Sequence, residues 1–394
     1  MLLLSFAYIF IFGLLVDCIC RAFKIPSLVG FLFLGIVLGP YAFNLLDPTI
    51  LDLSADLRQV ALIIILTRAG LSLDVRGLIK VGRPALLMCF LPATFEIIAT
   101  SLLAPRILGI SQADAMVLGT VLGAVSPAVV VPKMLNLIEK GYGTEKQIPQ
   151  IILAGSSADD IYVLVLFSSF LSVAQGGSFQ VTQLLTIPLS IILGLLIGGL
   201  LGAGLNSLFD RFALSTAKQL ILLLSLSFVL VSVEKILPAI PFSGILAVMA
   251  MGLVINRLDS EKAVDLGQYY NKLWIPGEIL LFVLVGASVN ISYAFQAGWQ
   301  PVLLIALVLI FRSMGVLLSL AKTHLSLKER LFSVIAYLPK ATVQAAIGGV
   351  PLAMGLGTGE IILTVSVVAI LITAPLGAFG IDLTYQRLLE KEVK

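Results

Sequence analysis

The chain has 394 residues, of which 59% are hydrophobic and only 12% are charged. Soluble domains carry about 25% charged residues, so this composition excludes an ordinary soluble domain and indicates a membrane protein in contact with lipid. The three cysteines and the single histidine support neither a disulfide framework nor a histidine-based metal or catalytic centre. A net charge of +3 gives no sign of a nucleic-acid-binding surface. We expect a protein that is not an enzyme, without a cofactor or a nucleic-acid partner.

Apolar runs of about 17–25 residues, separated by short polar connectors, predict transmembrane helices. We identify thirteen, at 2–20, 26–43, 56–73, 84–104, 112–137, 148–174, 182–207, 217–235, 240–256, 272–289, 300–320, 328–353 and 359–385. Most of the 25 lysines and arginines fall in connectors on one side of this arrangement. By the positive-inside rule, that bias predicts an outside N-terminus and an inside C-terminus. The first run lacks the basic start of a signal peptide, so we interpret it as a retained helix.

The two halves of the chain resemble each other at an offset of about 215 residues. Ile25-Pro26 opens the second span, and Ile240-Pro241 opens the ninth. A shift of seven spans reverses the direction of a helix across the membrane. The pattern therefore predicts two inverted six-helix repeats on either side of a linking helix, as is typical of secondary transporters.

Prolines and glycines interrupt a matched pair of spans. The fifth span contains Pro127 and Pro132, and the twelfth contains Pro339, Gly348 and Gly349. A proline removes a backbone hydrogen bond and frees a carbonyl group, and the ends of half-helices carry partial charges. An ordinary proline kink is the alternative for either helix alone. For the matched pair we expect crossed broken helices that form a binding site near the membrane midplane.

Five charged residues are predicted to lie deep in the membrane. Two of them, Asp159 and Asp160, are adjacent in the apolar sixth span. Glu96, Asp160, Arg312 and Lys340 each follow the start of their span by 12 residues, which at a rise of ~1.5 Å is roughly 18 Å into a ~30 Å hydrocarbon core. Charges at that depth must pair or line water. We expect Arg312 to form a structural ion pair with Glu96 or Asp159, and Lys340 to pair with an acid or cap broken backbone.

The adjacent aspartates diverge by about 100° around a helix, so one should face a cavity and the other a neighbouring helix. Ser156 and Ser157 in the preceding turn, together with Ser126, add hydroxyl oxygens. Carboxylate, hydroxyl and freed carbonyl oxygens suit an alkali cation. Because a carboxylate must lose its proton to bind a cation, the two compete. Combined with rocking of the site between the membrane faces, this competition predicts cation/proton exchange.

The chain resembles the paired-aspartate branch of the monovalent cation/proton antiporter superfamily, and in particular the NHA-type sodium/proton exchangers. The likeness is carried by GAVSPAVVVPKML at 123–135, GYGTEKQIP at 141–149, SSADD at 156–160, Phe311-Arg312 and LPKATVQAAIGG at 338–349. It implies the NhaA-like antiporter fold, a homodimer and a core domain that moves like an elevator. It also implies Asp160 as the main ligand of Na⁺ and H⁺, with Asp159 assisting. Because Arg312 stands where some members of the branch have a lysine, we expect electroneutral exchange.

We expect a single membrane transporter over residues 1–394, located in the inner or plasma membrane and serving pH homeostasis. Its core domain is predicted at about 56–174 and 272–385, its dimerisation domain at about 1–55 and 208–271, and a linker helix at 175–207, with no soluble regulatory domain. A potassium/proton antiporter is the nearest alternative, and a cation channel or a non-transporting sensor is an alternative of another class. An intramembrane aspartyl protease is excluded, because it needs its two aspartates on different helices.

Overall fold

The computed structural model describes residues 2–23, 25–72, 82–176, 181–237, 242–290, 292, 296 and 298–392. Apart from one isolated β-bridge, between Tyr142 and Lys391, the regular structure in these residues is helical. The helices are α1 (Leu2–Ala22), α2 (Ser27–Leu38), α3 (Pro48–Asp52), α4 (Ser54–Ser72), α6 (Arg83–Met88), α7 (Leu91–Leu108), α8 (Gln112–Gly123), α9 (Pro127–Lys140), α10 (Ile148–Ala174), α11 (Val181–Arg211), α12 (Thr216–Ile236), α13 (Gly244–Leu258), α14 (Ser260–Ala287), α16 (Gln300–Ser319), α17 (Leu327–Ala336), α18 (Thr342–Ile347), α19 (Val350–Ala353) and α20 (Gly359–Leu388).

The helices make this an all-helical, multi-pass membrane protein. Among the described residues, eight helical segments are long and apolar enough to cross a membrane by length and composition. Shorter apolar helices, such as α2 and α13, lie between them. Large apolar side chains such as Leu3, Ile11 and Leu200 are exposed, as expected for surfaces that face lipid. The predicted number of thirteen spans and their orientation stay predictions.

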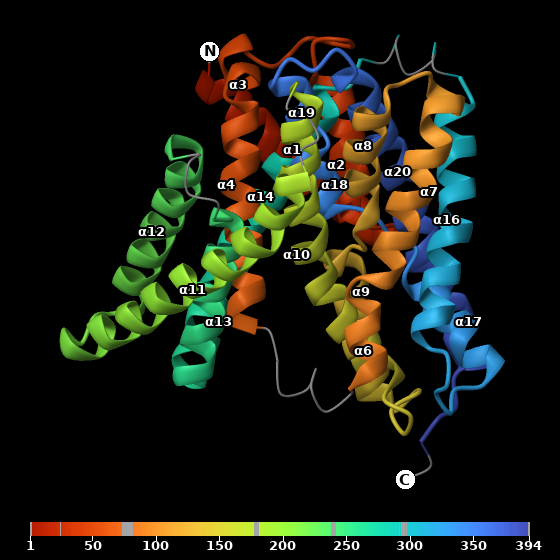
Figure 1. Cartoon of the computed structure of the whole chain (residues 1–394). Helices are drawn as coiled ribbons and strands as arrows, with labels where there is room; N and C mark the ends of the chain where they lie inside the picture. Colours follow the sequence, from red (N-terminus) through yellow and green to blue (C-terminus); the bar gives the residue numbers. More distant parts are fainter. Residues whose placement is uncertain are drawn as a thin grey trace.

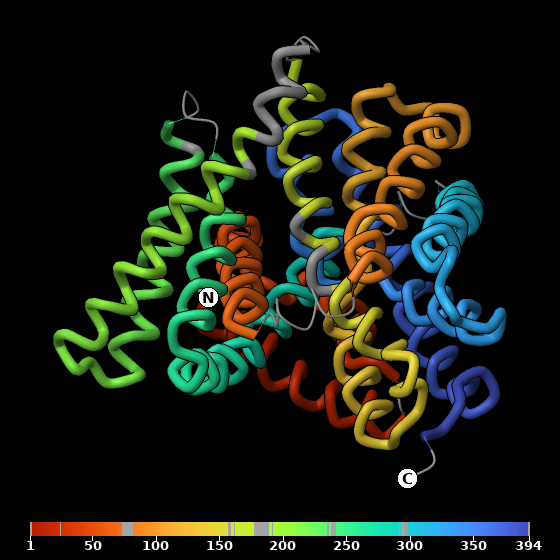
Figure 2. The backbone as a smooth tube through the Cα atoms, turned by 60° about the horizontal axis from the view of Figure 1, so that its bottom comes forward, coloured from red at the N-terminus to blue at the C-terminus, as the bar shows by residue number. Residues whose placement is uncertain are grey.

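Close helix packing joins α2, α4, α13 and α14, with α11 and α12 beside α13 (Figure 2). Small residues allow the backbones to approach. A Cβ at Gly35 of α2 would lie 2.0 Å from the Val283 carbonyl oxygen of α14, and one at Gly70 of α4 would lie 2.2 Å from that of Met249 in α13. The predicted core domain includes α4 and the second half of α14, whereas their packing ties both to helices predicted for the dimerisation domain. The domain division stays a prediction.

Three predicted spans are interrupted (Figure 1). The span at 84–104 forms α6 and α7, with Pro92 in the first turn of α7. The span at 112–137 forms α8 and α9, which are separated by the extended residues 124–126. The span at 328–353 forms α17, α18 and α19, with interruptions at 337–341 and 348–349. The first of these interruptions follows from no feature that the sequence analysis used.

Residues 389–392 lie along the connector at 141–147, which leads into α10. We call this contact the C-terminal clasp. The amide of Gly143 donates to the Glu390 carbonyl oxygen at 2.8 Å, and the amide of Glu392 donates to that of Gly141 at 2.8 Å. The Lys146 ammonium lies 3.0 Å from a Glu329 carboxylate oxygen and 3.2 Å from one of Glu390. Both contacts raise the pKa of Lys146, and the hydrogen bond to Glu329 has the larger effect. The clasp therefore ties the chain end to the start of α10 and to α17.

Candidate ion site at two crossed helix breaks

Two extended segments cross each other inside the bundle. The amide of Ser126 donates to the carbonyl oxygen of Pro339 at 2.8 Å, which joins the α8–α9 break to the α17–α18 break. Pro127 is the first residue of α9, a position that tolerates proline because its missing N–H has no helical partner there. The residue before a proline avoids helical geometry, and Ser126 is extended, with φ −90° and ψ 108°. Pro132 lies within α9, beyond the break.

Glu96, Arg312 and Lys340 form one buried ionic cluster beside this crossing, although they come from α7, α16 and the second break. One carboxylate oxygen of Glu96 lies 2.7 Å from Nη1 of Arg312, and the other lies 2.7 Å from Nζ of Lys340. All three side chains are at most 1% exposed. Arg312 is predicted to pair with Glu96 or Asp159, and both lie within ion-pair distance of it, Glu96 at 2.7 Å and Asp159 at 3.6 Å.

The two cations also satisfy the backbone where α8 ends. The last carbonyl groups of a helix have no partner within the helix and carry its negative partial charge. Here Nζ of Lys340 donates to the carbonyl oxygen of Leu122, Nη1 of Arg312 donates to that of Gly123 at 2.5 Å, and Nε2 of Gln344 donates to that of Ala124 at 2.9 Å. The positive charges of Lys340 and Arg312 therefore stabilise the break after α8, and the carboxylate of Glu96 balances those charges.

Asp159 is fixed in place by this arrangement. Its Oδ2 accepts a 3.0 Å hydrogen bond from the amide of Val125, which is free to donate because it lies in the break. The same oxygen is 3.6 Å from Nη2 of Arg312. Asp159 is 1% exposed, and its Oδ1 has no hydrogen-bond partner. One oxygen of this carboxylate thus has a structural contact and the other has unused acceptor capacity.

Further oxygen acceptors without a partner gather around the same break. They are Oδ1 of Asp160, Oγ of Ser126 and Oε1 of Gln344, all buried. Buried polar atoms are normally hydrogen-bonded, so a group of unpartnered acceptors needs an explanation. Carboxylate, hydroxyl and amide oxygens are ligands for hard cations. Ser156 is less available, because its hydroxyl donates to the Leu153 carbonyl oxygen at 3.2 Å, and the side chain of Ser157 lies outside the described residues.

The grouping of potential metal ligands among the described residues does not indicate a resident metal centre. Within the described part of the chain, no three His, Cys, Asp or Glu side chains come together as metal ligands. A cation near Asp159 and Asp160 would therefore need hydroxyl, amide or carbonyl oxygens in addition to the two carboxylates.

Two residues at the site were missed by the sequence analysis. Gln344 caps the end of α8, and Oγ1 of Thr373 in α20 accepts a 2.9 Å hydrogen bond from the amide of Lys340. Gln344 could have been found, because it is the one amide side chain in the apolar run 338–349. Thr373 carries no such signal. Gly348 and Gly349 lie at the second interruption of this span, where a Cβ at Gly348 would lie 2.5 Å from the Gln344 carbonyl oxygen.

Comparison with known proteins yields a consistent set of likenesses. Residues 6–385 match the family model described as "Sodium/hydrogen exchanger, transmembrane". The sodium/hydrogen exchanger 9B2 of Homo sapiens is 35% identical over 384 residues, which cover 93% of this chain and 70% of that protein. The sodium/hydrogen exchanger 9B1 of Homo sapiens is 32% identical over 396 residues, with 93% and 73% covered.

The fold has a solved counterpart. The structure of the sodium proton antiporter MjNhaP1 from Methanocaldococcus jannaschii at pH 8 superimposes with a TM-score of 0.83 at 19% identity and covers 97% of each chain. At that identity the likeness establishes the fold.

Proposed function

The chain belongs to the sodium/hydrogen exchanger family, and on that premise we propose that it is a secondary antiporter that exchanges Na⁺, or Li⁺, for H⁺ by alternating access. The observation that carries the proposal is the pair of unpartnered carboxylate oxygens on Asp159 and Asp160 beside the crossed breaks. A proton or a cation can occupy this position, but the two compete for the same oxygens. Exposure of the site to alternate membrane faces then exchanges one for the other.

The balance of buried charge supports electroneutral exchange. Glu96, Asp159 and Asp160 are three acids, and Arg312 and Lys340 are two bases, so the fully ionised set has a net charge of −1. Arginine stays protonated in proteins, and Lys340 is bound to Glu96. One monovalent cation or one proton therefore neutralises the set. We propose that one Na⁺ exchanges for one H⁺, with transport free of net charge movement.

The roles of the two aspartates differ in this proposal. Asp160 is the main carrier, because its buried Oδ1 has no hydrogen-bond partner. Asp159 assists through its own Oδ1, while its other oxygen is held by the amide of Val125. Ser126 supplies a hydroxyl ligand. Glu96, Arg312 and Lys340 have the structural role of holding the broken ends together as the site moves.

The larger architecture is proposed from the same family relationship. We propose thirteen membrane spans with the N-terminus outside and the C-terminus inside, two inverted six-helix repeats, a homodimer and a location in the cell membrane. An odd number of spans is supported by the two ends of the chain, which lie at opposite ends of the bundle (Figure 1). The meeting of the two helix breaks supports the repeats.

Dequenching of a pH-sensitive dye in proteoliposomes tests the proposal. Addition of Na⁺ or Li⁺ should dequench the dye with the wild-type protein but not with Asp160→Asn. Asp265→Asn is the matched control, because it removes an exposed carboxylate on α14. Activity that survives in Asp160→Asn would refute the assignment of the carrier.

Two further arms separate the alternatives. A response to K⁺ that exceeds the response to Na⁺ would identify a potassium/proton antiporter, and a cation flux without coupled proton movement would identify a channel. Currents on a solid-supported membrane that scale with turnover would refute electroneutral exchange.

A further inference from the structure

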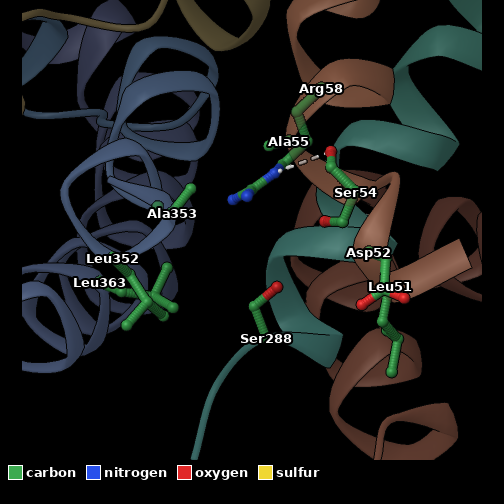
Figure 3. Close-up of a pocket in the computed structure, with 10 residues that line it drawn as sticks. Leu51, Asp52, Ser54, Ala55, Arg58, Ser288, Leu352, Ala353 and Leu363 are labelled. Atoms are coloured by element: carbon green, nitrogen blue, oxygen red, sulfur yellow. Dashed lines mark hydrogen bonds between the residues drawn. The ribbon is translucent and has the colours of Figure 1, made fainter. Parts of the chain in front are cut away.

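A second polar site lies away from the ion site, in a cavity of about 300 Å³ near the end of the bundle where the N-terminus lies (Figures 1 and 3). Its walls come from α3 and α4, from the residue that follows α14, from α19 and the residue before it, and from α20. The lining residues that matter here are Asp52, Ser54, Arg58, Ser288, Gly349 and Leu352.

Arg58 is the unusual residue in this cavity. It lies near the start of the predicted span at 56–73, yet it is only 5% exposed. Its Nε donates to the carbonyl oxygen of Ser54 at 3.2 Å, and its Nη1 has no partner. Among the described residues, no carboxylate lies within ion-pair distance of it. Arginine cannot lose its charge in a protein, so Arg58 is a buried cation without a counterion in the part of the chain that the structure describes.

The neighbours of Arg58 fix where the guanidinium points. It extends from α4 across the cavity toward α19 (Figure 3). A Cβ on Gly349 would lie 2.0 Å from Nη1, so the absence of a side chain there gives the guanidinium its space. The hydroxyl of Ser54, which is 3% exposed, also lacks a partner. The cavity thus contains a buried cationic donor and a buried hydroxyl donor, both unused.

These donors select the chemistry of a ligand. A guanidinium fork and a hydroxyl match the oxygens of a phosphate or carboxylate group. Asp52 at the exposed rim disfavours a dianion, because its own charge would repel a second negative charge. The remaining walls include Leu51, Leu352 and Leu363, which suit an attached apolar chain.

We propose that Arg58 and Ser54 form a binding site for a singly charged oxyanion, the class to which lipid phosphodiesters and small free oxyanions both belong. The ligand would provide the counterion that Arg58 lacks and would bridge α4 and the α19–α20 wall. A bound ligand stabilises the folded state according to its concentration and affinity. This inference does not depend on the transport activity, because binding and stability are measured directly.

The test uses the full chain purified in a neutral detergent, with thermal unfolding as the readout. Three ligands are titrated separately in a mildly acidic buffer, in which inorganic phosphate is mostly singly charged: phosphatidylglycerol, phosphatidylcholine and inorganic phosphate. The variants are Arg58→Gln, Arg58→Lys and Ser54→Ala. Arg106→Gln is the matched control, since Arg106 is an exposed arginine at the end of α7.

We expect phosphatidylglycerol to raise the unfolding midpoint of the wild type and of Arg106→Gln. The apparent affinity should fall at least tenfold in Arg58→Gln and by less in Arg58→Lys, which keeps the charge but not the fork. If Arg58→Gln does not fold, a smaller rise of the unfolding midpoint with phosphatidylglycerol in Arg58→Lys and Ser54→Ala than in the wild type supports the site equally well. A comparable response to inorganic phosphate supports a free oxyanion as the ligand, and a response to phosphatidylglycerol alone supports a lipid. Equal responses in the wild type and in all three site variants would overturn the proposal.

Discussion

Substitution of Glu96 by glutamine removes a carboxylate that contacts both Arg312 and Lys340. Its two oxygens lie 2.7 Å from Arg312 and 2.7 Å from Lys340. Glutamine preserves the shape of the side chain and deletes the charge. Both cations keep their backbone carbonyl partners at the end of α8, so the variant isolates the electrostatic contribution.

The magnitude follows from these distances. At an effective dielectric constant of about 20, an ion pair at 2.7 Å is worth about 6 kcal/mol, or about 12 kcal/mol for both pairs. Desolvation of each ion offsets several kcal/mol of that attraction. Removal of one partner from a buried pair costs about 3–5 kcal/mol, and we expect a loss in this range. Asp159, at 3.6 Å from Nη2 of Arg312, becomes the nearest acid to that guanidinium, so cation binding should weaken as well.

Equilibrium unfolding in mixed micelles measures this loss. Glu139→Gln, which removes an exposed acid on α9, should stay within about 0.5 kcal/mol of the wild type. The double variant Glu96→Gln/Lys340→Met removes one acid and one base, and we expect a coupling energy of about 0.5–3 kcal/mol between the two sites. A loss below about 0.5 kcal/mol in Glu96→Gln, or strict additivity in the double variant, would refute the reasoning.

Three further substitutions test other contacts. Gly155→Ala would place a Cβ 2.0 Å from the Tyr337 hydroxyl, so we expect a loss of about 1–3 kcal/mol in the same unfolding assay, and an unchanged midpoint would contradict it. Arg312→Lys keeps the charge but cannot reproduce the fork, so stability should fall by about 1–3 kcal/mol while dye dequenching persists. Lys146→Met removes the ion pairs of the C-terminal clasp, and carboxypeptidase should shorten this variant faster than the wild type; equal rates would show that the backbone contacts suffice.

That these charged residues share one level could be predicted from the sequence, but the full set of their partners could not. Equal spacing from the start of each span placed Glu96, Arg312 and Lys340 at one level, and the structure brings the three into contact. Spacing along a helix predicts how far into the membrane a residue lies, but it predicts neither the rotation of the helix nor which helix lies beside it. That Glu96 lies nearer to Arg312 than Asp159 does, at 2.7 Å against 3.6 Å, depends on how α7 and α16 pack, which no local pattern encodes.

Backbone groups and burial account for what the sequence analysis missed. The breaks at Pro127 and Pro339 could be anticipated because proline acts locally. The capping of α8 by Gln344 depends on a helix more than 200 residues away. Charged residues near the start of a span usually reach water, whereas Arg58 is buried. Its burial follows from the space that Gly349 leaves on a distant segment.

The C-terminal clasp connects residues 389–392 mechanically to the candidate ion site. Residues 389–392 are hydrogen-bonded to the connector at 141–147, and that connector continues directly into α10, the helix that carries both aspartates. The same lysine in the connector reaches α17, which ends at the second crossed break. A force or a partner that draws the tail away would act on both walls of the crossing at once. Labels and tethers attached at this end should therefore report on, and disturb, the helices that form the candidate ion site.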